Sequence, residues 1–474
     1  MNLPARSHQK SKRIAFILCS LFSLLLLPKV TPAETKPNIV VIYADDLGYG
    51  DLACFGHPTI KTPHLDQMAA EGMKFTQFYS AAPVCTPSRA ALLTGRYPIR
   101  SGMCSDKRRV LFPNSGGGLP SSELTLAEAL KETGYQTACV GKWHLGHLPQ
   151  FLPTSHGFDS YYGIPYSNDM DRVADRKLGR SIFLKPEVKF WNVPLMRDTK
   201  IIEQPAIQTT ITKRYTEEAV KFIQKNQKQP FFLYLAHSMP HVPLFRSKEF
   251  TDISRRGLYG DVIEEIDWSV GQILQELKSL GLDQNTIVWF SSDNGPWLIF
   301  NQQGGSAGLL REGKGSTWEG GMREPTLAWW PGHIPSSSVS QELGSTMDIY
   351  TTSINLAGGK IPSDRVVDGV DLTAVLMNTG KSPRDEMVYY RGTKLMALRK
   401  GPWKAHFITK PAYGKGAFQE HDPPVLYHLE HDPSEKYDVA KNYPEVIKSL
   451  LAAAEKHKKT VKPVPSQLEI PLEK

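Results

Sequence analysis

The chain has 474 residues, 40% of them hydrophobic and 22% charged, which is typical of a globular protein with room for one large domain and a smaller one. Its net charge of +8 overstates the charge of the folded part, because residues 1–33 hold five basic side chains and no acidic one. Without that segment the charge is +3, which gives no reason to expect a nucleic acid or a membrane surface as a partner.

Residues 1–33 are predicted to be a signal peptide. A basic stretch up to Arg13 precedes an apolar run at residues 14–27, and Thr31-Pro32-Ala33 offers a small residue for cleavage. The apolar run is shorter than the roughly 20 residues that a transmembrane helix needs. We therefore expect no stable membrane span after cleavage. The alternative is that the segment is retained as an N-terminal anchor. We expect export to a periplasm or to the outside, or to a lysosomal-type compartment in a eukaryote.

The main part of the chain alternates predicted strands and helices. Strands are expected at residues 38–44, 74–79, 135–140, 230–236, 285–292 and 323–330. Helices are expected at residues 64–72, 85–94, 125–134, 216–227, 259–281 and 347–358. Residues 168–205 lack periodicity and are expected to form surface loops. The alternation indicates an α/β fold with a largely parallel sheet.

The pattern changes after about residue 360. Residues 387–391 and 395–407 are predicted to be antiparallel strands, 445–459 a helix, and the proline-containing tail from Val461 an extended surface segment. We therefore divide the chain into a signal segment (1–33), a main domain (34–360) and a smaller C-terminal domain (361–474).

The most informative stretch is Cys85-Thr86-Pro87-Ser88-Arg89-Ala90-Ala91-Leu92-Leu93-Thr94-Gly95. Pro87 suits a first helical turn, the residues after it favour a helix, and Gly95 suits its end. Cys85 would lie at the helix N-terminus near Arg89, where the helix dipole and the positive charge would lower the pKa of its thiol. The alternative is a buried structural cysteine before an ordinary helix.

The other cysteines do not form a disulfide scaffold. Cys19 leaves with the signal segment, and Cys85 is set aside as the candidate functional residue. Three cysteines remain, Cys54, Cys104 and Cys139, so at most one disulfide could form among them.

Four oxygen donors follow two of the predicted strands: Asp45, Asp46, Asp293 and Asn294. Each pair alone is a common solvated turn. Together, at the carboxyl edge of one parallel sheet, they indicate a hard divalent cation, Ca²⁺ or Mg²⁺, rather than Zn²⁺.

Basic groups supply the opposing charge near the same edge: Lys142, His144, His241 and Lys314. Lys142 and His144 share one side if their segment is extended. Lys314 lies in a glycine-flanked loop that can approach an anion, although this loop lacks the spacing of a Walker A motif. His237 is a rival to His241. Any one of these side chains alone is usually an ordinary surface or core residue.

Residues 85–95 match every defined position of the type I sulfatase signature, C-[T/S]-P-S-R-x-x-x-L-T-G. The resemblance covers nearly the whole mature chain, since the motifs follow in the order of the arylsulfatases: Asp-Asp, C-T-P-S-R, G-K-W-H-L-G, G-I-P-Y-S, H-x-P, D-N-G and G-K-x-[T/S]-x-E-G-G. Within this family the chain looks closest to the arylsulfatase A and N-acetylgalactosamine-6-sulfatase groups.

The resemblance implies an alkaline-phosphatase-like fold, with a large mixed sheet flanked by helices and a smaller C-terminal domain made of an antiparallel sheet and a helix. It implies that a maturation enzyme converts Cys85 to Cα-formylglycine, whose hydrated aldehyde is the nucleophile. It also implies a Ca²⁺ site, with Mg²⁺ as the alternative, whose ligands are Asp45, Asp46, Cys85, Asp293 and Asn294.

The resemblance further assigns six catalytic residues: Cys85, Arg89, Lys142, His144, His241 and Lys314. Arg89 and Lys142 would steady the hydrated aldehyde, and His144 would be the base. A protonated His241 or Lys314 would help the alcohol to leave. The sulfate would be held by Lys142, Ser167, His241 and Lys314.

The predicted function is the hydrolysis of sulfate esters, on galactose or N-acetylgalactosamine carrying sulfate at position 6 or 3 within a glycan. Polar residues of the 168–205 segment are expected to contact the sugar or a second anion: Asn168, Asp169, Asp171, Arg172 and Arg176. A plain solvated loop is the alternative for that segment. A homo-oligomer is compatible with the sequence.

Two other functions remain open at this point. One is a phosphomonoester or phosphonate ester hydrolase of the same superfamily. The other is a secreted protein that lost catalysis and only binds sulfated glycans.

Overall fold

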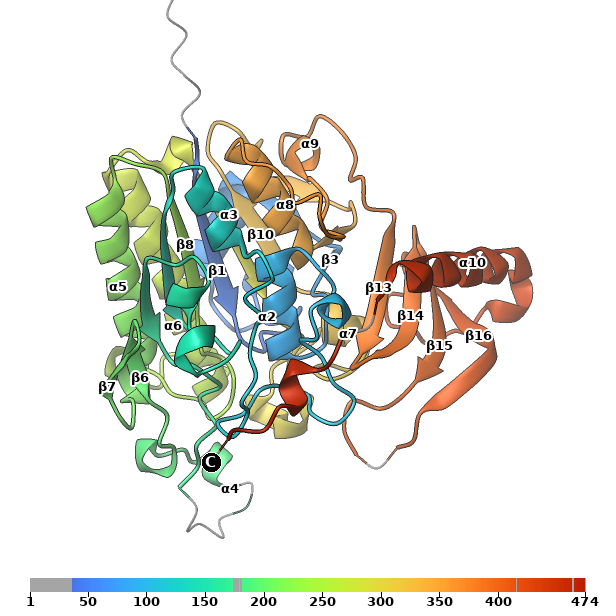
Figure 1. Ribbon diagram of the computed structural model, residues 1–474, viewed down its shortest axis with the longest axis horizontal. Helices are drawn as coiled ribbons and strands as arrows, with labels where there is room; N and C mark the ends of the chain where they lie inside the picture. Colours follow the sequence, from blue (N-terminus) through green and yellow to red (C-terminus); the bar gives the residue numbers. More distant parts are fainter. Residues whose placement is uncertain (1–35, 174–178, 180, 415, 463, 474) are drawn as a thin grey trace, which may run out of the picture. The chain divides into compact units, whose positions relative to one another are not determined.

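The computed structural model describes residues 36–173, 179, 181–414, 416–462 and 464–473, and the chain from Lys36 on forms one compact unit. The predicted signal segment and Arg176 lie outside the described residues. At the centre is a ten-stranded mixed sheet (Figure 1). In spatial order its strands are β11 (Ser338–Ser340), β2 (Met73–Phe75), β10 (Thr326–Trp329), β9 (Thr286–Ser292), β1 (Asn38–Ala44), β8 (Phe231–Ala236), β4 (Gln136–Gly141), β5 (Ser160–Gly163), β6 (Leu195–Arg197) and β7 (Lys200–Glu203).

The strands from β9 to β5 run parallel, and antiparallel pairs flank them on both sides. The central strand β1 is buried throughout, with Val40 and Ile42 in one hydrophobic core and Ile39 and Val41 in the other. A strand covered on both faces needs an uninterrupted apolar run, which is why this one was readable from the sequence.

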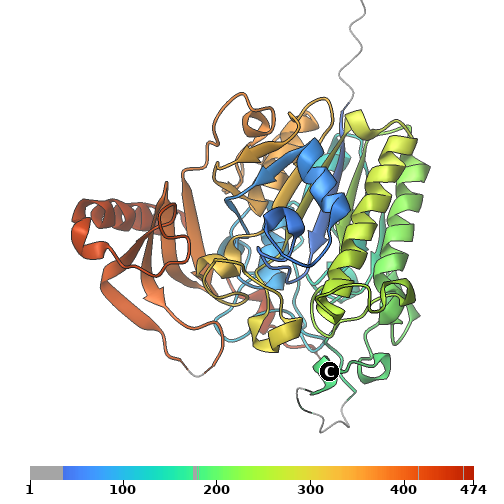
Figure 2. The same cartoon turned by 180° about the vertical axis from the view of Figure 1, so that it is seen from behind.

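Helices cover both faces of the sheet (Figures 1 and 2). The first core holds side chains of α1 (Pro63–Glu71), α5 (Ile211–Asn226) and α6 (Leu258–Ser279). The second holds side chains of α2 (Cys85–Thr94), α3 (Leu126–Glu132), α8 (Thr346–Leu356) and α9 (Thr373–Leu376). These positions confirm the predicted α/β class and the predicted helices, although α5 begins five residues before the expected start.

Two sequence-based predictions in this domain are wrong in detail. The strand expected at 74–79 is divided between β2 and β3 (Phe78–Tyr79), and β3 pairs with β12 (Gly344–Ser345) in a separate two-stranded sheet. The segment 168–205 contains the short helix α4 (Ser181–Leu184) and the hairpin of β6 and β7, which extends the large sheet at its edge. These edge strands have only three and four residues, which is too short to show a clear period.

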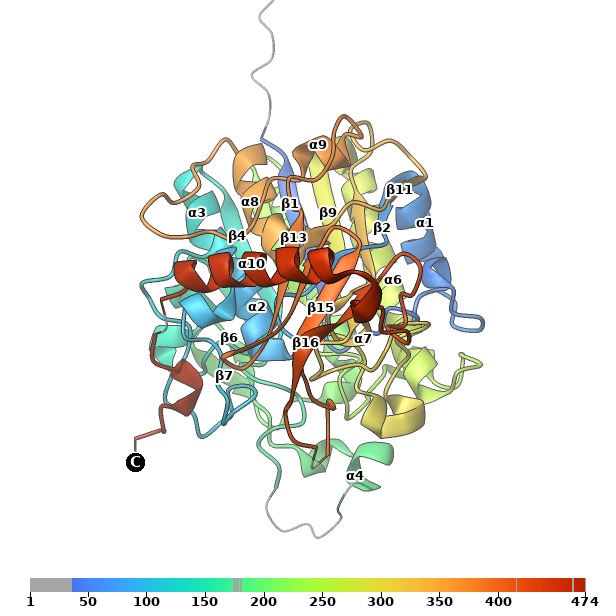
Figure 3. The same ribbon diagram turned by 90° about the vertical axis from the view of Figure 1, so that its right-hand side faces the viewer.

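The C-terminal part is a four-stranded antiparallel sheet: β13 (Glu386–Arg391), β14 (Lys394–Lys400), β15 (Trp403–Thr409) and β16 (Gln419–His428). Helix α10 (Pro444–Thr460) lies across it (Figure 3). A third core joins this sheet and α10 to Ala91 of α2 and to Met322 of α7 (Glu319–Met322). The antiparallel strands and the helix were predicted, whereas β16 was not.

The tail after α10 returns to the main domain. Leu468 is fully buried in the second core, and the amide of Gly116 donates to the carbonyl of Ile470 at 2.8 Å. The expectation of a purely surface tail is therefore wrong at Leu468. All four described cysteines are free: Cys54, Cys85, Cys104 and Cys139. Among the described residues, no helix has the length and apolar character needed to cross a membrane.

Candidate active site

Helix α2 presents Cys85 as its first residue. Pro87 is the third residue of the helix, where its missing N–H removes no helical hydrogen bond. Gly95 ends the helix with a φ of 67°, and its amide donates to the carbonyl of Ala91. Every residue of α2 is buried, so packing along the whole helix fixes the position of Cys85.

The predicted oxygen donors meet at the carboxyl ends of β1 and β9. These strands are in parallel register, with Ala44 opposite Ser292, so the residues that follow each strand lie side by side. The amide of Asn294 donates to Asp46 Oδ1 at 2.7 Å, and the backbone N–H of Asp46 donates to Asp293 Oδ1 at 3.1 Å. All of these side chains are at most 2% exposed.

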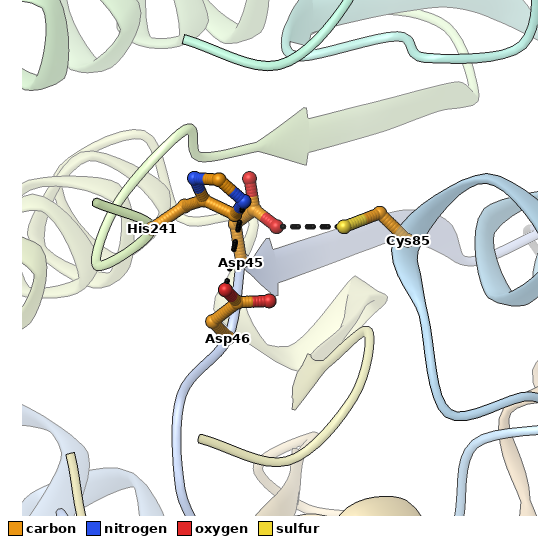
Figure 4. A group of neighbouring side chains, drawn as sticks. All are labelled: Asp45, Asp46, Cys85 and His241. Carbon is orange, nitrogen blue, oxygen red and sulfur yellow. Dashed lines mark hydrogen bonds and ion pairs between the residues drawn. The ribbon is translucent and has the colours of Figure 1, made fainter. Parts of the chain in front are cut away.

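The donor set fits a hard divalent cation. Figure 4 shows Asp45, Asp46, Cys85 and His241, which can each place one ligand atom within 4.8 Å of all the others. The Oδ1 atom of Asn294 is buried and has no hydrogen-bond partner among the described residues. Burial raises the pKa of Asp46 to about 7, and the nearby carboxylates add to this shift. A cation at this position would stabilise the crowded carboxylates and give Asn294 a partner.

Arg89 and Lys142 pair with two of these carboxylates, those of Asp293 and Asp45. Arg89 Nε donates to Asp293 Oδ2 at 2.9 Å, and its Nη1 donates to the carbonyl of Lys142. Lys142 Nζ lies 2.6 Å from Asp45 Oδ2 and 3.2 Å from Ser167 Oγ. Both basic side chains are fully buried, so their charges are compensated inside the protein.

Lys314 supplies a second ammonium group to the same pocket. Its Nζ lies 2.8 Å from the carboxylate of Asp46, 3.5 Å from Cys85 Sγ and 4.3 Å from the centre of the Trp297 ring. Burial lowers the pKa of Lys314, but Asp46 and the other anionic groups more than offset this and hold it well above its usual value. The side chain therefore stays positively charged.

Two histidines complete the pocket. His144 Nε2 lies 2.9 Å from the carbonyl of Leu111, which assigns the ring proton to Nε2, and its buried Nδ1 has no partner among the described residues. His241 Nδ1 lies 2.6 Å from the carbonyl of Val242, and its Nε2 lies 3.6 Å from Asp46. Burial lowers the pKa of both rings. The rival His237 instead contacts Ser269 of α6.

The pKa expected for Cys85 is wrong. Burial raises the pKa of this thiol far above its usual value, and although Lys142 and Lys314 oppose the shift, Asp293 and Asp45 add to it. The sequence shows the helix N-terminus but does not show that two carboxylates stand in front of it. As a cysteine, residue 85 is a neutral thiol that donates to Asp45.

The side chain of Asn168, which was expected to contact the sugar, is fully buried and its polar atoms bind groups of the protein. Its Oδ1 lies 3.1 Å from His241 Nδ1, and its Nδ2 donates to the carbonyl of Pro243. Asn168 therefore holds the His241 ring in place. Asp171 and Arg172 are partly or fully exposed, and Asp169 is partly buried.

Sequence reasoning missed the aromatic wall of the pocket. The rings of His241 and Trp297 lie 5.1 Å apart, and those of Trp297 and Tyr413 lie 6.0 Å apart. Trp297 could have been suspected because it closely follows Asn294, whereas nothing in the sequence around Tyr413 indicates the pocket.

Comparison with known proteins agrees with the geometry. The sulfatase family model matches residues 37–359, and the model for the C-terminal region of aryl-sulfatase matches residues 382–472. The chain is 43% identical to N-acetylgalactosamine-6-sulfatase of Mus musculus, over 92% of this chain and 89% of that one. It is also 43% identical to arylsulfatase A of Homo sapiens, over 90% and 89%.

Solved structures extend the match to three dimensions. The crystal structure of Ps i-CgsB in complex with k-i-k-neocarrahexaose has a TM-score of 0.78 and 32% identity, over 93% of this chain and 95% of that one. The predicted alkaline-phosphatase-like architecture is confirmed. Because both family models match and the relatives align over about nine-tenths of the chain, this chain belongs to the sulfatases, enzymes that hydrolyse sulfate esters.

Proposed function

We propose that the enzyme removes sulfate from sulfated sugars of a glycan, galactose or N-acetylgalactosamine above all, using Cys85 in its formylglycine form and a Ca²⁺ ion. One observation carries the proposal: Cys85 Sγ lies 3.5 Å from Asp45 Oδ1 and 3.5 Å from Lys314 Nζ, between the cation ligands and an ammonium group. The sugar named for the N-acetylgalactosamine-6-sulfatases and the oligosaccharide bound by Ps i-CgsB support a glycan substrate.

The sulfatase family depends on formylglycine and binds a metal ion. The hydrated aldehyde at position 85 supplies one hydroxyl group to attack sulfur and a second that allows sulfate to be released, which neither serine nor cysteine offers. The cation, which adds positive charge for the sulfate oxygens, would be held by Asp45, Asp46, Asp293, Asn294 and residue 85.

The basic side chains of the pocket bind the sulfate group. Lys142 and Lys314 aim their ammonium groups at the space around residue 85, and Ser167 and His241 contact each other at 3.4 Å beside it. As the bond to the alcohol breaks, negative charge develops on oxygen, and buried charges fixed in advance stabilise it without reorganisation. Arg89 keeps Asp293 in position.

Two proton transfers remain for the side chains. His144 carries its proton on Nε2, so its free Nδ1 can accept the proton of the second hydroxyl group. The leaving alcohol takes a proton from the charged Lys314, or from His241 once its Nε2, 3.6 Å from Asp46, is protonated.

The test has two parts. The mass of the tryptic peptide that contains Cys85 should show the loss of sulfur expected for formylglycine, and the purified enzyme should hydrolyse a simple aryl sulfate far faster than the matching phosphate ester. A faster rate on the phosphate or phosphonate ester favours the related hydrolase. Binding of sulfated sugars without turnover favours a silent binding protein. A panel of sulfated galactose and N-acetylgalactosamine derivatives then identifies the sugar.

Export is part of the proposal. The basic stretch, the apolar run and the small residue at the end of residues 1–33 support a cleaved signal peptide. N-terminal sequencing of the mature protein should begin just after Ala33, whereas an intact N-terminus in a membrane fraction would favour a retained anchor.

A further inference from the structure

A cavity of about 130 Å³ opens beside the reaction pocket, between the start of α2 and the C-terminal sheet. Pro83 and Val84, which immediately precede Cys85, form one wall together with Gly315, which follows Lys314. Arg391 and Lys410 of the C-terminal part form another. The same two loops therefore line both this cavity and the reaction pocket.

Three basic side chains line the cavity, and we call it the cationic cavity: Arg109, Arg391 and Lys410. Their hydrogen bonds go to carbonyl groups rather than to acids, since Arg109 and Arg391 both donate to the carbonyl of Ala412. Lys410 Nζ lies 4.1 Å from the centre of the Phe418 ring. Within the described part of the chain, no carboxylate forms a salt bridge with any of the three.

These positive charges act on one another. Burial and the nearby Arg109 lower the pKa of Arg391 to about 10. Burial, Arg391 and Arg109 lower the pKa of Lys410. Clustering of like charges costs free energy unless an anion joins them, so the arrangement favours an anionic ligand.

The nearby carboxylates have other partners. Asp106 lines the cavity, but its two oxygens accept hydrogen bonds from the backbone N–H and the hydroxyl of Thr393, at 2.9 and 2.7 Å. Glu312 accepts from the backbone N–H of Ala412 at 3.2 Å. Both acids therefore hold loops in place. Among the described residues, neither forms a salt bridge with the three basic side chains, although the charge of Glu312 partly opposes the lowering of the pKa of Arg391.

A continuous row of side chains connects the cationic cavity to the reaction pocket. The Arg109 guanidinium lies 4.5 Å from the centre of the Tyr413 ring, and that ring lies 6.0 Å from Trp297. Trp297 in turn contacts Lys314. The backbone N–H of Gly315 donates to the carbonyl of Pro83 at 2.8 Å, which ties the two shared loops together.

We propose that the cationic cavity is a subsite for a second anionic group, a sulfate or a carboxylate, on the same glycan that carries the reacting sulfate. This inference rests on the proposed function and narrows its substrate class to glycans with at least two negative charges near each other. Guanidinium groups bind both anions through paired hydrogen bonds. The volume exceeds the roughly 30 Å³ that one water molecule occupies in the liquid.

The test compares three substrates on the wild-type enzyme: a simple aryl sulfate, a monosulfated disaccharide, and the same disaccharide with a second anion on the adjacent sugar. Separate versions with a second sulfate and with a uronate carboxylate tell the two anions apart. We expect kcat/KM to be about tenfold higher with the second anion, mainly through a lower KM, and this advantage to shrink at high salt.

The double variant Arg109→Gln/Lys410→Gln should reduce that advantage to about twofold or less while aryl sulfate turnover stays within about twofold of the wild type. Lys107→Gln is the matched control. Lys107 is two residues from Arg109, 81% exposed and paired with Glu469 at 2.9 Å, and it does not line the cavity. This control should keep the full advantage. If the double variant unfolds, Lys410→Gln alone is used, because no hydrogen bond of its ammonium group is lost.

An equal kcat/KM for singly and doubly charged disaccharides, or an unchanged advantage in the variants, overturns the subsite. Failure of the wild type on the aryl sulfate overturns the proposed function instead. In that case, equilibrium binding of the same disaccharides to Cys85→Ala decides on the subsite: tighter binding of the doubly charged ligand, lost with Arg109→Gln, supports it, and equal binding refutes it.

Discussion

The reaction pocket and the cationic cavity both contain several basic side chains, but the groups that compensate their positive charge differ. In the reaction pocket, Lys142 lies 2.6 Å from Asp45 and Lys314 lies 2.8 Å from Asp46, and all four side chains are almost completely buried. In the cationic cavity, Arg109 is exposed, donates to the carbonyl of Ala412 and lies over the Tyr413 ring.

The difference follows from solvent access. A buried ammonium group without a partner is very costly, so the reaction pocket must bring carboxylates together with its lysines. Water and salt screen the exposed guanidinium of Arg109, whereas the partly buried Arg391 donates to three carbonyl groups, so neither needs a carboxylate partner. The buried pairs sit at the ends of the central strands, whereas the unpaired charges sit on loops and on the second sheet. In our proposal the reaction uses groups at the strand ends, whereas a second anion of the substrate binds on these loops and on the second sheet.

The largest effect should come from residue 85. Cys85→Ala and Cys85→Ser should both lower multiple-turnover hydrolysis of an aryl sulfate by a factor on the order of 10⁴ or more, because neither residue offers two hydroxyl groups on one carbon. Thermal unfolding should stay close to that of the wild type, since α2 packs through its other residues. Full turnover in Cys85→Ala would contradict the proposed nucleophile.

Removal of the cation should have the next largest effect. A chelator should lower kcat by a factor on the order of 10² to 10³ and lower the melting temperature, because the carboxylates lose their shared partner. Added Ca²⁺ should restore both. Elemental analysis should find calcium or magnesium in a one-to-one ratio, and stoichiometric zinc without either would refute the assigned donor set.

The nucleophile and the cation ligands could be predicted from the sequence because each lies next to a recognisable helix or strand pattern. The buried strands β1 and β9 produce continuous apolar runs, and the residues that follow them must meet at one edge of the sheet. The burial around Cys85, and with it the direction of its pKa shift, depends on contacts between segments about 40 and 200 residues apart. Arg391 ends a strand of the other sheet and Lys410 follows one, so no sequence spacing indicates the cationic cavity.

A third region, the junction between α7 and the C-terminal sheet, also contains a buried lysine with carboxylate partners. Removing this lysine tests how much a buried ion pair contributes to stability. Lys404 lies 2.8 Å from Glu319 and 3.0 Å from Glu435, and all three are fully buried. Lys404→Met should lower the free energy of unfolding by about 3–5 kcal/mol, because it removes the ammonium group shared by two buried carboxylates. Urea unfolding measures this loss. Lys400→Met, at a half-exposed pair with Glu386, is the control and should cost less than about 1 kcal/mol.

The same junction makes a prediction about pH. Burial alone would raise the pKa of Glu319, but Lys404 and the neighbouring arginines outweigh burial and lower it from 4.5 to about 2. The resulting stabilisation is fully present above pH 4.5 and is lost as the pH falls through about 2. Urea titrations between these values should show the wild type losing stability on acidification. A slope that is unchanged in Lys404→Met would show that this ion pair is not its source.

The smallest effect should come from Asn168. Its variants test whether this residue serves the reaction pocket or the binding of the glycan. Because Asn168 holds His241 from behind, Asn168→Ala should lower kcat about tenfold with little change in KM, and should shift the pH dependence of kcat through the altered ring environment. Asn168→Asp, which keeps the accepting oxygen, should recover part of the rate.

Asp171→Ala is the matched control three residues later in the same segment. The side chain of Asp171 is partly exposed and accepts from Tyr166 at 3.4 Å and from Asn192 at 3.5 Å. It should leave aryl sulfate turnover unchanged. If Asn168→Ala weakens glycan binding but leaves kcat and its pH profile unchanged, Asn168 is a sugar-binding residue. It would also contradict the separation of reaction chemistry at the strand ends from substrate selection on the second sheet.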